Sequence, residues 1–468
     1  MRKGLLPSSR KASEMSNLSL TQALPRLINS VPRSRSLEAV LLFWVAGMHA
    51  FQLAQIQLSV TDNLDEEILL YWTPLFLASY AVHFVLRFKA RAADSLILPL
   101  ATLLNGLGIS MIYRLDLAEV ARGNEQLLGA RQVWLTVFAM LVAALVIWLL
   151  KDHMVLKRFT YIAMAVGILL LLTPMLPVIG REINGARLWV GIGDISFQPG
   201  EIAKLVLIVF FAGYLTRHRE SLSLIGKKIW RIRIPRARDL GPLLLVWFAS
   251  LGVLVLQRDL GTSLLYFGIF LGLLYVATGR GFYAGIGIGM IITGGLVASQ
   301  LLSYVGNRFD SWLNPFLSEN YSGVGGSYQL VQGLFGMAHG GILGTGLGGG
   351  YPQLVPLAAN DFIFAAIAEE LGLVGVFAVL SVYLLLTYRG LRISLAHRDD
   401  FSRLLAAGLS FVIALQVFIV VGGVLRVVPL TGLTTPFLAA GGSSLLANWL
   451  LVAILLRISD SSNRQVVQ

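Results

Sequence analysis

Long apolar stretches dominate this chain and restrict it to one class of fold. Its 468 residues are 56% hydrophobic and 13% charged, whereas a soluble domain is closer to half apolar and a quarter charged. One helical crossing of a bilayer core about 30 Å thick needs about 20 apolar residues. The sequence therefore predicts an all-α fold, a polytopic transmembrane helical bundle of about twelve spans. The twelve stretches are roughly 38–58, 69–87, 94–112, 132–150, 159–178, 201–216, 240–256, 261–279, 282–302, 362–386, 404–426 and 435–456.

Basic residues are distributed unevenly between the two sides of this predicted bundle. If the N-terminus lies in the cytoplasm, the inner segments hold 28 of the 37 Lys and Arg residues and the outer segments hold 9. This positive-inside bias predicts that both termini are cytoplasmic. Membrane topology thus accounts for the net charge of +12, and we expect membrane lipids and no nucleic acid as partners. The basic loop 227–238 is interpreted as a topology signal in contact with anionic lipids, with partner binding as the alternative.

Composition also suggests how the chain is organised. Two of the outer loops are long, and a long loop in a compact protein is often functional. Within them, we expect residues 180–200 to lie along the outer interface and residues 328–338 to form a short re-entrant or interfacial helix. The predicted parts are a disordered basic cytosolic tail (1–37), two additional N-terminal transmembrane helices (38–93), a transmembrane core (94–457) with a large outer loop (303–360), and a cytosolic C-terminal tail (458–468).

Two adjacent carboxylates, Glu369 and Glu370, interrupt an apolar span. If a helix begins near Asp361, the pair lies ~12–14 Å along it, close to the middle of the bilayer core. A charged side chain there costs roughly 2.5–3.5 kcal/mol, so each acid needs a partner or a water-filled cavity. Because successive residues point about 100° apart on a helix, we expect the two acids to have different partners.

A second group of charged residues is predicted at the outer edge of the membrane. Glu201 and Lys204 are three residues apart and share a helix face, while Asp259 precedes another span at the same edge. An unpaired ammonium at this depth is costly, so we expect Lys204 to pair with Glu201 or with Asp259. Such a pair serves either structure alone or a functional cavity.

Six motifs, in order, resemble those of the SEDS family of membrane peptidoglycan polymerases, the RodA and FtsW proteins. The similarity covers roughly residues 95–457, and it is strongest to actinobacterial RodA proteins. The motifs are INGARLW (183–189), QPGEIAK (198–204), QRDLGTSL (257–264), SYQLVQGLFGMAHGG (327–341), NDFIFAAIAEELGLVG (360–375) and PLTGLTTPFLAAGGSSLLANWLL (429–451).

This resemblance implies an inverting peptidoglycan glycosyltransferase. Such an enzyme polymerises lipid II, an undecaprenyl-linked disaccharide peptide, on the outer face of the cytoplasmic membrane during cell elongation or division. The resemblance also implies a class B penicillin-binding protein as partner, a possible divalent cation (Mg²⁺ or Mn²⁺), and a central cavity lined by Lys204, Glu201 and Asp259. The alternative functions are a lipid II flippase and a non-catalytic scaffold of the elongation or division machinery.

The resemblance also assigns roles to residues of the outer loops. A general base must accept the proton of the attacking sugar hydroxyl, and cations must stabilise the pyrophosphate that leaves. The family's catalytic aspartate lies in the large outer loop, but no aspartate follows Pro315 in the corresponding stretch of this chain. Glu319 is therefore the candidate base, with Asp310 as the alternative catalytic residue and a solvated loop acid as the structural interpretation. The candidate pyrophosphate contacts are Arg187, Arg258 and Arg308.

Two further features of the outer loop are interpreted as structural. His339 is expected to be a loop histidine rather than a ligand. The glycine-rich run GTGLGGG (344–350) loosely matches a dinucleotide-binding fingerprint, but it follows no strand of a βαβ unit, so that interpretation is rejected.

Overall fold

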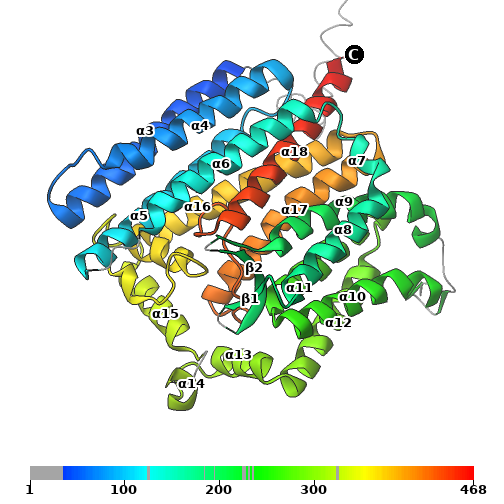
Figure 1. The fold of residues 1–468 in the computed structure, drawn as a ribbon. Helices are drawn as coiled ribbons and strands as arrows, with labels where there is room; N and C mark the ends of the chain where they lie inside the picture. The colour runs from blue at the N-terminus through cyan, green and yellow to red at the C-terminus, as the bar shows by residue number, and fades with distance from the viewer. Residues whose placement is uncertain are drawn as a thin grey trace, which may run out of the picture.

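The computed structural model describes residues 35–467 except 124–126, 184, 194, 224–227, 230–231, 234–236 and 323–325. This part of the chain is a bundle of long helices, with short helices and strands in the connections (Figure 1). Its helices are α3 (Arg35–Thr61), α4 (Ile68–Lys89), α5 (Ile97–Ala121), α6 (Leu128–Leu149), α7 (Val155–Arg158), α8 (Thr160–Leu172), η1 (Thr173–Met175), α9 (Pro199–Ser223), α10 (Ala237–Gln257), α11 (Leu260–Thr278), α12 (Gly281–Leu301), α13 (Ser303–Leu313), α14 (Ser318–Ser322), α15 (Tyr328–Gly340), η2 (Pro352–Leu354), α16 (Ile363–Ala396), α17 (Asp400–Val424) and α18 (Gly442–Val467).

The predicted helical membrane fold is confirmed. Each of the twelve predicted stretches coincides with a helix, and ten helices of the described part are long and apolar enough to cross a membrane. The other two apolar helices, Thr160–Met175 and Leu244–Gln257, are shorter. The predicted short helix of the large outer loop is α15.

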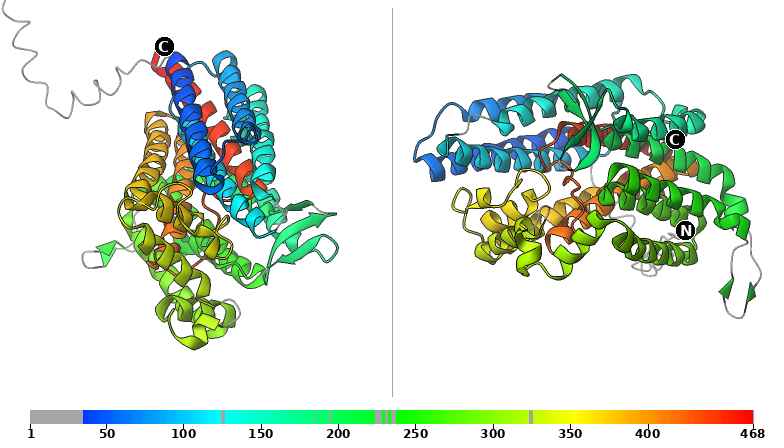
Figure 2. Two further views of the ribbon diagram at one scale, coloured as in Figure 1. Left: turned by 90° about the vertical axis from the view of Figure 1, so that its left-hand side faces the viewer. Right: turned by 60° about the horizontal axis from the view of Figure 1, so that its bottom comes forward.

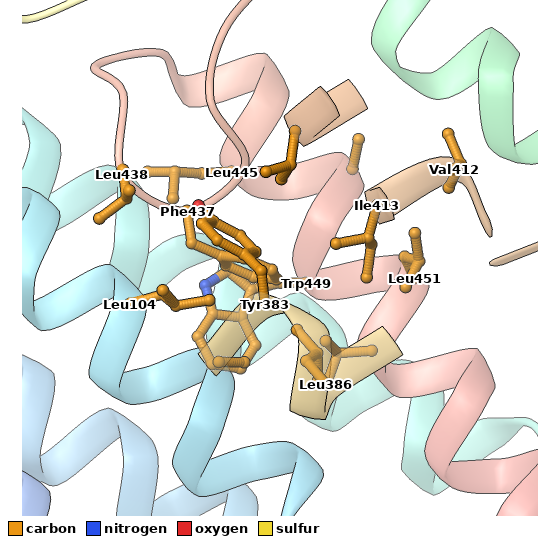
Figure 3. Close-up of a cluster of buried hydrophobic side chains, with 14 of the residues drawn as sticks. Leu104, Tyr383, Leu386, Val412, Ile413, Phe437, Leu438, Leu445, Trp449 and Leu451 are labelled. Atoms are coloured by element: carbon orange, nitrogen blue, oxygen red, sulfur yellow. The ribbon is translucent and has the colours of Figure 1, made fainter. Parts of the chain in front are cut away.

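Apolar side chains from distant parts of the sequence form the core of the bundle. The helix α17 packs between α16 and α11, α18 packs against α6, and α3 packs against α4 and α5. Figure 3 shows one buried cluster, in which Tyr383, Phe437 and Trp449 come from three separate segments of the chain. The rings of Phe437 and Trp449 meet edge to face with their centroids 5.6 Å apart. Within a bilayer such rings stabilise the bundle through close van der Waals packing rather than through removal from water.

The bundle has two distinct ends, which Figures 1 and 2 show from three directions. We call the end that carries α13–α15 the loop pole and the opposite end, where α18 finishes, the C-terminal pole. At the C-terminal pole the buried Arg457 donates hydrogen bonds to the carbonyl oxygens of Lys89 and Lys151, both at 2.7 Å. One side chain of α18 thereby holds the ends of α4 and α6 together.

The chain termini differ in how much of them the structure describes. Residues 458–467, which the sequence assigns to a cytosolic tail, continue α18 as a helix. Asp460 is buried there and accepts a hydrogen bond from the Ala92 backbone at 2.9 Å. Most of the predicted N-terminal tail, residues 1–34, lies outside the described residues, and α3 begins at Arg35.

A small antiparallel sheet occupies residues 180–197, which the sequence analysis treated as an interfacial loop. Its strands are β1 (Gly180–Ile183), β2 (Ala186–Ile192) and β3 (Ile195–Phe197), paired in that order. The dipeptide Asn184–Gly185 is a hairpin signal because a tight β-turn needs positive φ, and Gly185 has φ 77°. A second strand pair, β4 (Lys228–Ile229) with β5 (Ile232–Arg233), lies in the basic loop, whose other residues are largely outside the described part.

Candidate functional site

The first turns of α9 bring a buried ion pair to the loop pole. Lys204 donates hydrogen bonds to the Glu201 carboxylate at 2.5 Å and to the Gln416 side-chain oxygen, on α17, at 3.0 Å. All three residues are buried, and we call them the α9 cluster. The predicted Lys204–Glu201 pair is therefore confirmed. Gln416 is a partner that sequence reasoning missed, because it lies 212 residues away from Lys204.

Asp259 caps α11, which packs against α9, but it has a different bonding partner from the α9 cluster. It is the N-cap residue of α11, and its carboxylate accepts a hydrogen bond from the Thr262 backbone at 3.0 Å. The alternative pairing of Lys204 with Asp259 is not what the structure shows. Burial raises the pKa of Asp259 above its usual range, while the bonds from Thr262 and the positive charge of Arg308 oppose that rise. Asp259 is thus a buried acid whose charge depends on a neighbouring arginine.

The three predicted pyrophosphate contacts occupy different positions at the loop pole. Arg308, on α13, donates a hydrogen bond at 3.0 Å to the carbonyl oxygen of Leu430, in the segment between α17 and α18. Arg258 is exposed between α10 and α11 and adopts a positive φ of 55°, which is rare for a residue other than glycine. Arg187 lies on β2 and pairs with Glu182 at 2.9 Å in an exposed ion pair. Arg308 is the one whose charge acts directly on Asp259.

A partly buried acid, Asp361, is also affected by Arg308, and sequence reasoning gave it no role. It lies just before α16, and burial raises its pKa while Arg308 and a hydrogen bond from Gln329 oppose the rise. Burial also raises the pKa of Tyr304, on α13, while the positive charges of Arg258 and Arg308 oppose that rise. The charge of Arg308 therefore acts on two acids from other segments and on a tyrosine of its own helix.

The two candidate bases lie further out, on the connection between α13 and α15. Asp310 is on α13 and Glu319 is on α14, and both side chains are exposed. Over the described residues, neither carboxylate forms an ion pair or a hydrogen bond. Neither is joined to the α9 cluster or to Asp259. Both acids are therefore free to accept a proton from a molecule bound at the loop pole.

The acids of the described ranges do not form a ligand set for a metal ion. No group of three or more His, Asp or Glu side chains there comes close enough together to hold one. A hard cation such as Mg²⁺ takes oxygen ligands, often one or two carboxylates plus substrate phosphates. The described residues alone therefore do not form a cage for the predicted Mg²⁺ or Mn²⁺, and such an ion would also need oxygen ligands from a bound substrate.

The acids that interrupt α16 have separate partners, as predicted. Glu370 forms a buried ion pair with Arg114 of α5 at 2.9 Å and accepts a bond from the Gly348 backbone at 3.1 Å. Glu369 accepts a bond from the Tyr351 backbone at 2.9 Å and pairs with His339 at 3.1 Å. His339 is half exposed at the end of α15, so its role is to pair with Glu369.

A break in α16 explains the glycine-rich run of the outer loop. The helix is interrupted at Gly372, with φ 65° and ψ −170°. Residues 341–350, which we call the glycine loop, bond to the interrupted backbone. These bonds run from Thr345 N to Glu369 O, from Gly346 N to Glu370 O, from Leu373 N to Gly341 O and from Val374 N to Ile342 O, at 3.0–3.1 Å. A Cβ at Gly344 or Gly372 would lie 2.2 Å from backbone atoms of the opposite segment. The glycines therefore permit backbone contact, which agrees with the rejection of a dinucleotide site.

These features define a multi-pass helical membrane protein whose loop pole combines buried ion pairs with exposed acids. The chain belongs to the FTSW_RODA_SPOVE family of cell cycle proteins, whose family model matches residues 94–464. It is 43% identical over 436 residues to the peptidoglycan glycosyltransferase RodA of Mycobacterium tuberculosis, covering 93% of this chain and 92% of that protein. It is also 35% identical to a probable peptidoglycan glycosyltransferase FtsW of Coxiella burnetii over 65% of this chain and 79% of that protein.

Solved structures agree with this family and its fold. A structure described as a peptidoglycan synthase complex that coordinates polymerization and crosslinking contains a chain 28% identical to this one, with a TM-score of 0.61. The alignment covers 79% of this chain and 98% of that one. The rod shape determining protein RodA of Thermus thermophilus has a TM-score of 0.54 at 25% identity. The mycobacterial alignment of 436 residues is longer than the 375 residues from 94 to 468, so it extends into the N-terminal helices.

Proposed function

We propose that this chain is a peptidoglycan glycosyltransferase that polymerises lipid II on the outer face of the cytoplasmic membrane, in cell elongation and shape. The carrying observation is that family-matched charged residues, which are far apart in sequence, meet at the loop pole. Lys204 and Arg308 lie on α9 and α13, Asp259 caps α11, and the positive charge of Arg308 acts on the buried Asp259. The names of the mycobacterial and Coxiella relatives support the same activity.

The chemistry assigns a role to each group of the loop pole. A sugar hydroxyl attacks the anomeric carbon of the donor, a carboxylate accepts the hydroxyl proton, and the lipid pyrophosphate leaves. Glu319 is proposed as that base because it is exposed and has no partner in the described part of the chain, with Asp310 as the alternative. Arg308 and Arg258 are proposed to bind the pyrophosphate, and Arg187 to contact it from the sheet.

The buried residues are proposed to shape the cavity in which these groups act. Lys204 is already paired with Glu201, so its role is to position the cavity wall rather than to supply a free cation. A divalent cation, Mg²⁺ or Mn²⁺, remains a proposal from the family resemblance. A class B penicillin-binding protein is the proposed partner, and the inner membrane with both termini in the cytoplasm is the proposed location.

The direct test is polymerisation of lipid II by the purified protein in the presence of its transpeptidase partner. Removal of a general base typically lowers the rate ~10²–10⁴-fold, so Glu319→Gln should polymerise at that reduced rate while unfolding at the temperature of the unmutated protein. If Glu319→Gln is fully active and Asp310→Asn is not, the base is Asp310. Full activity of both variants would remove the base from this loop.

The same assay separates the competing functions. A flippase would move lipid II between leaflets of a vesicle without lengthening glycan strands. A scaffold would do neither, but it would raise the activity of its partner. Polymerisation by the unmutated protein that survives inactivation of the partner's transpeptidase site is the result this proposal requires.

A further inference from the structure

The C-terminal pole carries a cavity that the proposed reaction does not use. It has a volume of about 540 Å³ and lies between the first residues of α3, the last turn of α4 and the turn that follows α4. A volume of a few hundred Å³ accommodates a small ligand or a lipid headgroup. Among the described residues, the lining side chains are Arg35, Ser36, Arg87, Phe88 and Arg91, and three of these five are arginines.

One wall of this cavity is held in place by a network of bonds. Arg35 donates to the carbonyl oxygen of Arg91 at 3.2 Å and to that of Ala90 at 3.1 Å, which ties the start of α3 to the turn after α4. It also contacts the carboxylate of Glu38, which is fully buried and lies 2.7 Å from the His83 ring. The charge of Arg35 is thereby matched by Glu38, and Arg35 serves as a structural wall.

The other two arginines keep their charge unmatched. Arg87 and Arg91 are exposed, and neither forms an ion pair over the described ranges. The Nε of Arg91 donates to the backbone carbonyl oxygen of Arg87 at 3.2 Å, which ties the Arg91 side chain to the end of α4 and leaves its two terminal nitrogens available. Neighbouring acids are already engaged, since Asp94 pairs with Arg389 and Asp460 pairs with Arg464. The open cavity therefore has a net positive lining.

The flank of the cavity is apolar and belongs to a membrane span. Phe84 and Phe88 are 54% and 63% exposed on α4, four residues apart and so on one face of the helix. The ammonium of Lys89 lies 4.0 Å from the centre of the Trp148 ring, and tryptophan and lysine favour the boundary between headgroups and acyl chains. A ligand here meets guanidinium groups at one end and an apolar helix face at the other.

We propose that this cavity binds the headgroup phosphate of an anionic phospholipid, with its acyl chains against Phe84 and Phe88. An arginine fork forms two parallel hydrogen bonds with phosphate oxygens. In a zwitterionic headgroup, the lipid's own ammonium offsets the negative charge of the phosphate and so weakens its attraction to the arginines. The site is part of the two N-terminal helices and lies outside residues 94–464, which the family model matches. It is therefore independent of the proposed polymerase activity.

The test is lipid binding to the full-length protein, measured by native mass spectrometry with phosphatidylglycerol, phosphatidylcholine and soluble glycerol phosphate as separate probes. The variant is Arg87→Gln with Arg91→Gln. Its matched control is Arg158→Gln with Arg398→Gln, which removes two exposed arginines of the same pole that do not line the cavity. A juxtamembrane arginine contributes about a fivefold factor in affinity, so the cavity variant should bind phosphatidylglycerol on the order of 10- to 30-fold more weakly.

The expected pattern is specific to both the lipid and the position. Phosphatidylglycerol should bind more tightly than phosphatidylcholine, and the control variant should retain most of that preference. Equal losses in the two variants would mean diffuse surface attraction and would overturn the proposal. Equal binding of both lipids would also overturn the proposal, because the site would then have no preference for an anionic headgroup. Glycerol phosphate binding as tightly as phosphatidylglycerol would overturn it too, because the acyl chains would then contribute nothing to the affinity.

Discussion

At the α16 break, each buried acid pairs with a basic side chain and also accepts a backbone hydrogen bond, whereas Asp259 has its helix-cap bond but no ion pair over the described residues. Glu370 is bonded to Arg114 and to the glycine loop, and Glu369 to Tyr351 and His339. Asp259 is instead buried directly after the exposed Arg258, and the charge of Arg308 acts on it. Both regions carry acids of family-matched motifs, so sequence alone did not separate them. The difference teaches that complete bonding marks a charge that holds the fold, while incomplete bonding marks a charge available to a ligand.

The largest effect is expected from adding one methyl group at the α16 break. In Gly372→Ala the new Cβ would lie 2.2 Å from the backbone nitrogen of Gly344, and φ 65° disfavours any side chain. The glycine loop must then separate from α16, and we expect little folded protein by size-exclusion chromatography. Gly289→Ala is the control, because that glycine lies in α12 with no atom within 4 Å of an added Cβ. Normal yield of Gly372→Ala would show that the loop contact is dispensable.

The next largest effect concerns the ion pair of the break. Arg114→Leu leaves Glu370 buried without its cation, and breaking a buried pair in this way typically costs about 3–5 kcal/mol. The thermal unfolding temperature should fall steeply. The double variant Arg114→Leu with Glu370→Leu should recover part of the loss, because no lone charge remains. A control on the same helix is Arg122→Gln, which breaks an exposed pair and should change little.

A smaller stability effect, with a large loss of activity, is expected at Asp259. Asparagine caps a helix as well as aspartate does, so Asp259→Asn should keep the bond to Thr262 and the unfolding temperature. Asp259→Ala loses the cap and should be less stable by about 0.5–2 kcal/mol. Both should polymerise lipid II poorly, because both lack the charge beside Arg308. Full activity of Asp259→Asn would reduce this residue to a cap.

The smallest effect is a pH dependence with a defined sign. The pKa of Asp259 is raised on folding, so the folded protein binds this proton more tightly than the unfolded chain does. The contribution of protonated Asp259 to the stability of the folded protein is complete below the ordinary aspartate pKa of about 3.9. It is lost as pH rises through the raised pKa of the folded state. The stability of the unmutated protein should therefore fall relative to that of Asp259→Asn as pH rises through this interval. Arg308→Gln removes an opposing charge, so it should raise the folded-state pKa of Asp259 and extend the interval to higher pH without moving its lower end.

How much the sequence could predict depends on whether the signal was local. Twelve apolar stretches and the Glu201–Lys204 spacing were local, and both appear as predicted. The pairing of Arg114 with Glu370 spans 256 positions, and no periodicity relates two such residues. The sheet was missed although Asn184–Gly185 is a hairpin signal, because the strands around it are short. The base was unresolved because a free loop acid and a catalytic one look alike in sequence.

The most direct test of this contrast is polymerisation of lipid II per folded molecule, measured together with the unfolding temperature. Two variants suffice, namely Asp259→Asn and the double variant Arg114→Leu with Glu370→Leu. The double variant should be less stable than the unmutated protein. Its turnover per folded molecule should equal that of the unmutated protein. Asp259→Asn should unfold normally and lose turnover. The reverse pattern, with normal turnover in Asp259→Asn and none in the folded double variant, would contradict the account.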